Sequence, residues 1–247
     1  MVFRVLALIG IVLAELSASA QQFEVVSIKP NTVDDVNQRS VQSQLGGRIR
    51  FVGMPLSTFI MPAYDVWSFQ ILGGPSWIDT DGWDITAQAE GVQGRLTREQ
   101  LSSRLRTMLE DRFQLKAHRE TKLQPGFSLS VDDRGPKLQP NTDGKVSNGS
   151  NRDTLNARKV TMQWFAAFLI QKLRGTVVDE TGLKGEYDFI LHWSPESTQL
   201  SPSDDPFGSN YPSIFTAVRE QLGLRLIERT MPTEVLVIDS VQRPSPN

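Results

Sequence analysis

Two histidines, His118 and His192, are the residues best suited to acid–base chemistry in this 247-residue chain. His118 stands two positions before Glu120, so in a strand both side chains share one face, where the carboxylate could orient the imidazole. A solvated polar face without a function gives the same pattern. Neither histidine has a second histidine at ligand spacing, so no zinc motif of the H-E-x-x-H type is present. One hypothesis is therefore a secreted hydrolase that uses His118 or His192 with a carboxylate.

Three carboxylates, Asp79, Asp81 and Asp84, fall within the short stretch DTDGWD. Their spacing does not match a calcium-binding EF-hand loop, and Asp and Gly are ordinary turn residues. Because the chain has no cysteine, thiol nucleophiles, thiolate metal sites and disulfides are excluded. Neither a G-x-S-x-G nucleophile motif nor a phosphate-binding glycine loop occurs. We therefore predict no catalytic set, no metal site and no cofactor.

Aromatic residues gather in two parts of the sequence. Exposed Trp and Tyr side chains stack on sugars and ligand rings, whereas buried ones are ordinary core residues. The two groups are Tyr64, Trp67, Trp77 and Trp83, and Trp164, Tyr187 and Trp193. The ligand-binding site that we predict consists of Trp77, Trp83, Asp84, Tyr187 and Asp188. Replacing Trp83 and Tyr187 with alanine is expected to abolish binding without unfolding the protein.

Charge and the N-terminal sequence limit the class of protein. With 26 basic and 28 acidic residues the net charge is −2, and no basic stripe is present, so nucleic acid is not an expected partner. Residues 1–20 predict a signal peptide, with Arg4, an apolar run and the cleavage motif Ala18-Ser19-Ala20. The mature protein is then expected to be periplasmic or extracellular, with no transmembrane segment after cleavage. Its partner would be an unknown small molecule, a glycan or an envelope protein.

The first half of the chain alternates between strand and helix patterns. The motif T-x-x-Q at Thr97–Gln100 is a capping box that predicts the start of a helix. Proline and glycine at 125 and 126 predict a hairpin turn. The expected elements are strands at 23–31 and 48–53, a helix at 55–66, strands near 70–73 and 83–89, the helix from Thr97, and strands at 112–121 and 126–131.

The second half repeats this order, with a strand near 156–160, a helix capped by Thr161, two strands around a Gly182–Gly185 hairpin turn, a helix at 213–222, and two strands joined at Pro232. We interpret the whole as α+β, an internally duplicated β-α-β-β-α-β-β unit with mainly antiparallel sheets and helices packed on one face. The expected divisions are a signal peptide at 1–20, a first half at 21–135, a linker loop at 136–156 and a second half at 157–247. Residues 21–247 are expected to form one globular unit.

Five stretches together resemble the soil-associated protein family, a domain of unknown function expanded in soil bacteria such as acidobacteria. They are FEVVSIKPN, GGPSWIDTDGWDI, LEDRFQLKAHRET, VVDETGLKGEYDFIL and SIFTAVREQLGLRLIERTMPTEVLVIDSVQRPS. The resemblance runs from Phe23 to Pro244 and implies a signal peptide but no established reaction, cofactor or catalytic residue. Similar domains also occur at the C-terminal, extracytoplasmic end of membrane proteins that resemble penicillin-sensing antirepressor metallopeptidases. This placement implies a sensing or binding role.

We therefore expect a non-enzymatic exported domain that binds or senses an unknown ligand in the bacterial envelope. The first alternative is the secreted hydrolase described above. The second is a protein–protein adaptor that uses an exposed sheet edge, such as that of the C-terminal strand.

Overall fold

A computed structural model describes residues 22–32, 38–194 and 211–244 of the chain. The predicted signal peptide at residues 1–20 lies outside the described residues. The described part contains twelve strands and five α-helices, which confirms the α+β class. The chain divides into two compact units, namely unit 1, Met1–Thr121 with Glu234–Asn247, and unit 2, Lys122–Thr233. No described helix is long and apolar enough to span a membrane.

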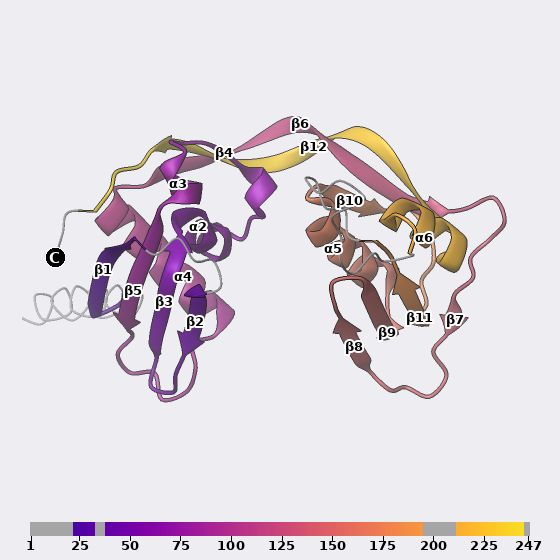
Figure 1. Ribbon diagram of the computed structural model, residues 1–247, viewed down its shortest axis with the longest axis horizontal. Helices are drawn as coiled ribbons and strands as arrows, with labels where there is room; N and C mark the ends of the chain where they lie inside the picture. Colours follow the sequence, from indigo (N-terminus) through magenta and orange to yellow (C-terminus); the bar gives the residue numbers. More distant parts are fainter. Residues whose placement is uncertain (1–21, 33–37, 195–210, 245–247) are drawn as a thin grey trace, which may run out of the picture. The chain divides into compact units, whose positions relative to one another are not determined.

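Unit 1 contains an antiparallel sheet of four strands in the order β1-β5-β3-β2 (Figure 1). The strands are β1 (Val25–Asn31), β5 (Gly82–Gln88), β3 (Arg48–Pro55) and β2 (Ser40–Ser43). The sequence predicted all of them except β2, since no strand was expected between residues 31 and 48. In β5 buried and half-buried residues alternate, as expected when one face of a strand points to the core.

Two helices complete the core of unit 1, namely α2 (Leu56–Tyr64) and α4 (Arg98–Phe113). The capping box that predicted α4 is confirmed, because the Thr97 hydroxyl accepts from the Gln100 N–H at 3.2 Å and the Gln100 side chain accepts from the Thr97 N–H at 3.0 Å. Phe113, at the end of α4, is fully buried. Short elements then lead from α2 to β5: the 3₁₀ turn η2 (Ser68–Gln70), β4 (Ile71–Gly73) and α3 (Trp77–Thr80).

Unit 2 contains a second antiparallel sheet, in the order β7-β11-β9-β8, and its own hydrophobic core. Its strands are β7 (Gln139–Pro140), β11 (Tyr187–His192), β9 (Thr154–Val160) and β8 (Ser147–Ser150). Helices α5 (Met162–Leu173) and α6 (Ile214–Leu222) supply buried residues to the same core. Residues 136–156, which were expected to be a linker loop, thus contribute β7 and β8 to this sheet.

A third sheet has the order β10-β6-β12-β4 and contains two long strands. Both β6 (Lys116–Val131) and β12 (Leu224–Ser240) are continuous, so the hairpins predicted at Pro125 and Pro232 are wrong. Pairing of β6 with β10 begins only at Gly126, and pairing of β12 with β4 begins at Leu236. Each proline therefore precedes the residues that pair with β10 or with β4. Its missing N–H costs no hydrogen bond in either of these two ladders.

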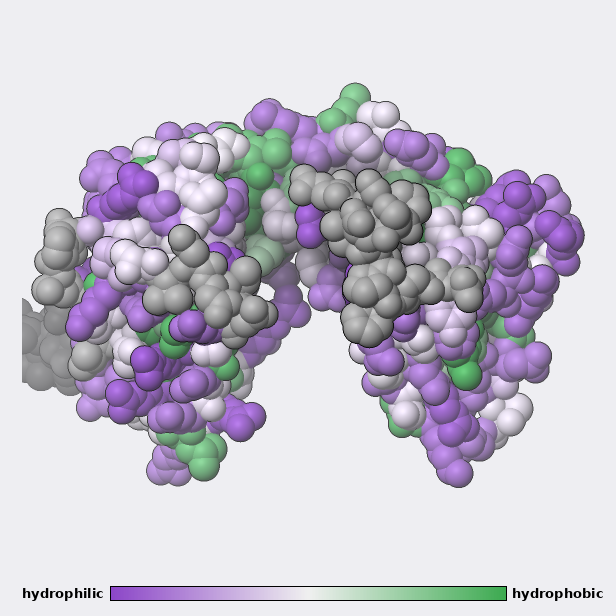
Figure 2. All heavy atoms as spheres, in the orientation of Figure 1, coloured by the Kyte–Doolittle hydropathy of each residue, from purple (hydrophilic) through white to green (hydrophobic). Residues whose placement is uncertain are grey.

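The sequence predicted a hairpin turn at Gly182–Gly185, but the turn does not connect two strands of a hairpin. The strand before it, β10 (Thr176–Asp179), pairs in parallel with β6, whereas β11 after it belongs to the antiparallel sheet of unit 2. In the sheet order the C-terminal strand β12 lies between β6 and β4, and β4 pairs with it at Leu236, Val237 and Ile238. The surface visible in Figure 2 is largely hydrophilic, with scattered hydrophobic residues, in keeping with apolar side chains turned to the cores.

Candidate functional site

A pocket of about 350 Å³ lies in unit 1 where the ends of β1 and β3 meet the start of β5; we call it the unit 1 pocket. Its walls include Asn31, Gly53 and Gly82 from these three strands. Its other lining residues are Pro30, Thr32, Arg39, Thr80, Asp81, Trp83 and Arg243. Three of the predicted site residues, Trp77, Trp83 and Asp84, lie in or next to this region.

Trp83 lines the unit 1 pocket but is only 3% exposed. Its ring packs edge-to-face against Trp77, with centroids 6.3 Å apart, and against Phe113 at 5.4 Å. Its indole N–H has no acceptor among the described residues. A buried donor without a partner costs about 1–3 kcal/mol, so native proteins rarely leave one. Trp83 is thus a core residue in the pocket wall whose one polar atom is buried and has no acceptor among the described residues.

Two arginines line the rim of the unit 1 pocket, and they differ in whether a described carboxylate forms an ion pair with them. Arg243 donates from Nε and Nη2 to Asp81 Oδ2 at 3.0 and 2.8 Å, and its guanidinium lies 4.9 Å from the centre of the Trp77 ring. The ring face of Trp77 is therefore already covered. Arg39 is exposed and forms no ion pair with a described carboxylate. Its guanidinium is the cationic group of the rim that a ligand could bind.

Asp84 holds two walls of the unit 1 pocket in place. Its Oδ1 accepts from Asn31 Nδ2 at 2.6 Å and from the Gly53 N–H at 2.8 Å. Because Asn31 and Gly53 line the pocket and Asp84 does not, Asp84 positions the walls and does not itself face a ligand.

The other two predicted site residues, Tyr187 and Asp188, lie in unit 2 and therefore do not share the unit 1 pocket. The Asp188 carboxylate accepts from the Lys159 N–H at 2.8 Å and from Asn141 Nδ2 at 2.8 Å. These two hydrogen bonds hold the pKa of Asp188 below its ordinary value, and the bond from the Lys159 N–H has the larger effect. The Tyr187 ring lies so close to Gly185 that a Cβ there would be 2.9 Å from it. A larger residue at position 185 would therefore require the Tyr187 ring to move.

The two histidines have different surroundings. His118 Nδ1 lies 3.0 Å from both carboxylate oxygens of Asp239, and both side chains are about half exposed. His192 Nδ1 lies 3.1 Å from Thr154 Oγ1, and its ring stacks on Tyr211 at 4.9 Å. The carboxylate that orients His118 is therefore Asp239 on β12. Sequence reasoning proposed Glu120 and missed Asp239, which is 121 residues from His118.

Asp239 also lines a second pocket of unit 1, of about 450 Å³, together with Tyr64 and Glu110. The Tyr64 hydroxyl donates to Glu110 Oε1 at 3.4 Å. Burial, with the nearby Glu110 charge, raises the pKa of Tyr64 to about 12, so the hydroxyl stays protonated at neutral pH. Among the described residues no group of three or more His, Asp or Glu side chains is arranged to hold a metal ion.

Comparison with protein families gives a match over most of the chain. The model of a family described as "Protein of unknown function (DUF3738)" matches residues 57–241. This stretch contains all five predicted site residues and both histidines. No curated protein and no solved structure matches the chain.

Proposed function

The chain belongs to the DUF3738 family, and we propose that it is an exported binding or sensing protein of a soil bacterium that holds a small polar ligand in the unit 1 pocket. The observation that carries this proposal is that Trp83 lines the pocket while its buried indole N–H has no acceptor among the described residues. A ligand atom that accepts this hydrogen bond would remove the cost of the unpartnered donor and so add to the binding free energy.

The groups around the unit 1 pocket favour a ligand rich in acceptor oxygens. The Trp83 indole can only donate, and the Arg39 guanidinium offers several donors that fit a carboxylate. Asp81 is the acidic residue among the described lining, and Arg243 neutralises it. A small carboxylated or hydroxylated molecule, such as an acidic sugar, meets these groups. This favours the small-molecule and glycan classes over an apolar ligand.

The first experiment is a thermal-shift screen of residues 21–247 against muropeptides, β-lactams, glycans and divalent metals. A ligand present at about 100 times its Kd stabilises the fold by about 2.7 kcal/mol, which is easily detected. For each hit, the indole N–H resonance of Trp83 is followed by ¹⁵N NMR and assigned with Trp83→Phe. We expect the hit to shift this resonance.

Arg39→Gln is expected to lower the affinity for the ligand found in the screen about tenfold, because a charged hydrogen bond is lost. The matched control is Arg50→Gln, since Arg50 is an exposed arginine of β3 that does not line the pocket. A hit that leaves the Trp83 resonance and the Arg39→Gln affinity unchanged would place the ligand elsewhere. A flat screen with a folded protein would favour a protein partner instead.

The internal duplication is part of the same proposal. It is supported by the strand orders of the two antiparallel sheets, which begin β1-β5-β3 in unit 1 and β7-β11-β9 in unit 2. In each sheet the strand that comes latest in the chain lies between the other two. A helix follows β3 in unit 1 and β9 in unit 2. A long strand of the third sheet then follows α4 and α6. A common ancestor of the two halves would explain these parallels.

A second candidate function is hydrolysis, which the His118–Asp239 pair favours. The carboxylate lies at hydrogen-bond distance from Nδ1 and could orient the ring so that Nε2 acts as a general base. The test is turnover of ester and glycoside substrates by the wild type and by His118→Ala. Activity that survives replacement of both His118 and His192 would remove this candidate.

A further inference from the structure

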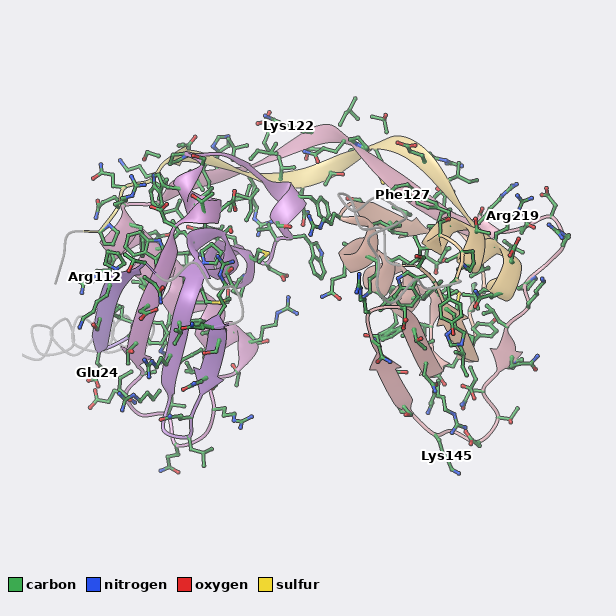
Figure 3. The ribbon with its side chains drawn as sticks, viewed as in Figure 1. Glu24, Arg112, Lys122, Phe127, Lys145 and Arg219 are labelled. Atoms are coloured by element: carbon green, nitrogen blue, oxygen red, sulfur yellow. The ribbon has the colours of Figure 1, made fainter. Side chains whose placement is uncertain are left out.

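Unit 2 contains a pocket of about 500 Å³ with an aromatic floor, which we call the unit 2 pocket. Phe127 on β6 and Phe215 on α6 lie with ring centroids 5.5 Å apart. Trp193, which is 3% exposed, forms another part of the lining. Figure 3 labels Phe127, whose strand pairs with β10 at this point. A volume of this size fits a drug-sized molecule, and the rings fit the apolar part of one.

Three cations surround this floor, namely Arg152, Lys172 and Arg174, and all three are exposed. The Lys172 ammonium lies 5.2 Å from the centre of the Trp193 ring and 5.3 Å from that of Phe168. No acidic residue occurs among the described residues of the lining. The apolar floor keeps the local dielectric low, so the field of these charges is stronger than on an open surface.

These three cations differ from the other arginines around the sheet of unit 2. Four of those arginines, Arg158, Arg219, Arg225 and Arg229, lie within 3.6 Å of a carboxylate oxygen. By contrast, no described carboxylate forms an ion pair with Arg152, Lys172 or Arg174, although unit 2 has acidic residues available. The positive charge of the pocket is therefore not neutralised by the described part of the chain.

The backbone of Arg174 has the conformation of a helix C-cap. Arg174 is the C-cap of α5 and has a φ of 50°, in the left-handed region that favours glycine. The next helix, α6, ends on Gly223 with a φ of 65°. A non-glycine residue in this conformation is strained, and the C-caps of α2 and α4, Asp65 and Gln114, share it with a φ of 51°. The strained position places a guanidinium at the rim of the pocket.

We infer that the unit 2 pocket binds a small organic anion, a carboxylate or sulfonate attached to an aromatic ring. The half-buried Phe127 and Phe215 side chains take the ring, and Arg152, Lys172 and Arg174 take the negative charge. Planar guanidinium groups suit carboxylates and sulfonates because two N–H groups can bind two oxygens at once. This site is separate from the unit 1 pocket and does not depend on the function proposed for it.

The probe for a test is 1-naphthoate, with the neutral 1-naphthamide as its uncharged counterpart. Calorimetric titration of the full chain is expected to give a Kd for 1-naphthoate at least tenfold lower than for 1-naphthamide. The affinity for 1-naphthoate should also fall between 50 and 500 mM salt, because the attraction is electrostatic. Failure to bind 1-naphthoate, or equal binding of the amide, would overturn the inference.

Arg174→Gly locates the site and also controls for folding. We expect it to weaken 1-naphthoate about tenfold, the loss typical of one charged hydrogen bond. It should also raise the thermal transition of the protein, because glycine relieves the left-handed strain. Weaker binding by a more stable protein cannot result from unfolding.

The matched control is Gln114→Gly, because Gln114 is the left-handed C-cap of α4 in unit 1, with a φ of 51°. This variant should also raise the thermal transition, but it should leave the Kd for 1-naphthoate unchanged. Lys172→Met, which removes the charge but keeps an unbranched side chain, should weaken binding of the probe as Arg174→Gly does. Unchanged affinity in both Arg174→Gly and Lys172→Met would show that the probe binds elsewhere and would overturn the inference.

Discussion

Asp84 in unit 1 and Asp188 in unit 2 make the same two kinds of hydrogen bond. Each carboxylate accepts from an asparagine side chain, Asn31 for Asp84 and Asn141 for Asp188. Each also accepts from a backbone N–H of the neighbouring strand. In both sheets this N–H lies close to an irregularity in strand register. An aspartate therefore closes the same kind of bulge twice in one chain.

Replacing Asp84 with alanine should destabilise unit 1. The Gly53 N–H and the Asn31 side chain would lose their acceptor, at a cost of about 1–3 kcal/mol. Urea unfolding measures this free energy. Thr86→Ala, on the same face of β5, is the matched control and should cost less than the aspartate variant. Equal losses in the two variants would mean that the hydrogen bonds of Asp84 are not what stabilises the bulge.

Replacing Asp188 with asparagine should have an effect that depends on pH. The pKa of Asp188 in the folded protein lies below its ordinary value of 3.8, chiefly because of the Lys159 N–H. The charged carboxylate thus stabilises the fold above pH 3.8, and this contribution is lost as the pH falls through the lowered pKa. Asp188→Asn should therefore be less stable than the wild type at pH 7 and approach it in acid. A difference that is constant with pH would contradict this.

The two residues that donate their N–H to these aspartates, Gly53 and Lys159, have φ angles of 62° and 57°. Lys159→Gly should stabilise the protein by up to about 1 kcal/mol, because the left-handed conformation costs an L-residue roughly 1–2 kcal/mol that glycine does not incur, less the greater entropy of glycine in the unfolded chain. Gly53→Ala should destabilise the protein by at least as much, because alanine is strained in this conformation. The nearest atom to the added Cβ is 3.5 Å away, so a steric clash does not contribute. Thermal unfolding of both variants tests these opposite signs, and two changes of the same sign would refute the argument.

Glu24 should make stability decrease with rising pH. A hydrogen bond with Glu90, followed by desolvation and the Glu90 charge, raises the pKa of Glu24 above its ordinary value of 4.5. The folded state therefore holds a proton more tightly than the unfolded state, and stability is lost as the pH rises through the raised pKa. Glu90→Gln should be more stable than the wild type at pH 7 and equal to it below pH 4.5. Thermal unfolding at the two pH values measures this, and no gain at pH 7 would contradict the pairing.

Replacing Trp83 with alanine should destabilise unit 1 by about 3–5 kcal/mol, because a fully packed aromatic side chain is lost. The sequence alone had suggested that this change would spare the fold. Trp164→Ala is the comparison, since Trp164 is 37% exposed and should cost much less. Chemical denaturation of both variants separates a core tryptophan from a surface one, and similar losses would contradict the burial of Trp83.

Local signals in the sequence predicted several elements correctly. The capping box at Thr97 and the N-cap at Thr161 depend only on residues three positions away, and both are present. The partners of strands are not local. Pro125 and Pro232 were interpreted as hairpin turns because proline often breaks a strand, whereas here each lies where one side of a long strand is not yet paired.

The candidate sites show the same limit. Composition and short motifs identified Trp83 and Asp84 as notable, but only packing shows that the first is buried and the second positions the walls of a pocket. The carboxylate beside His118 comes from the far end of the chain. No short-range pattern identifies such a partner, because the sheet that joins them depends on the whole chain.

The division of the chain between the two units has a consequence for the order of synthesis. Unit 2 is one uninterrupted stretch, Lys122–Thr233, whereas unit 1 is closed by residues from Glu234 onward. Two of these, Leu236 and Ile238, are buried in the core of unit 1. Although most of unit 1 is translated before unit 2, its core is incomplete until Leu236 and Ile238, which follow unit 2, have been made. The part of the protein that is translated in the middle is thus the first that has its whole core available.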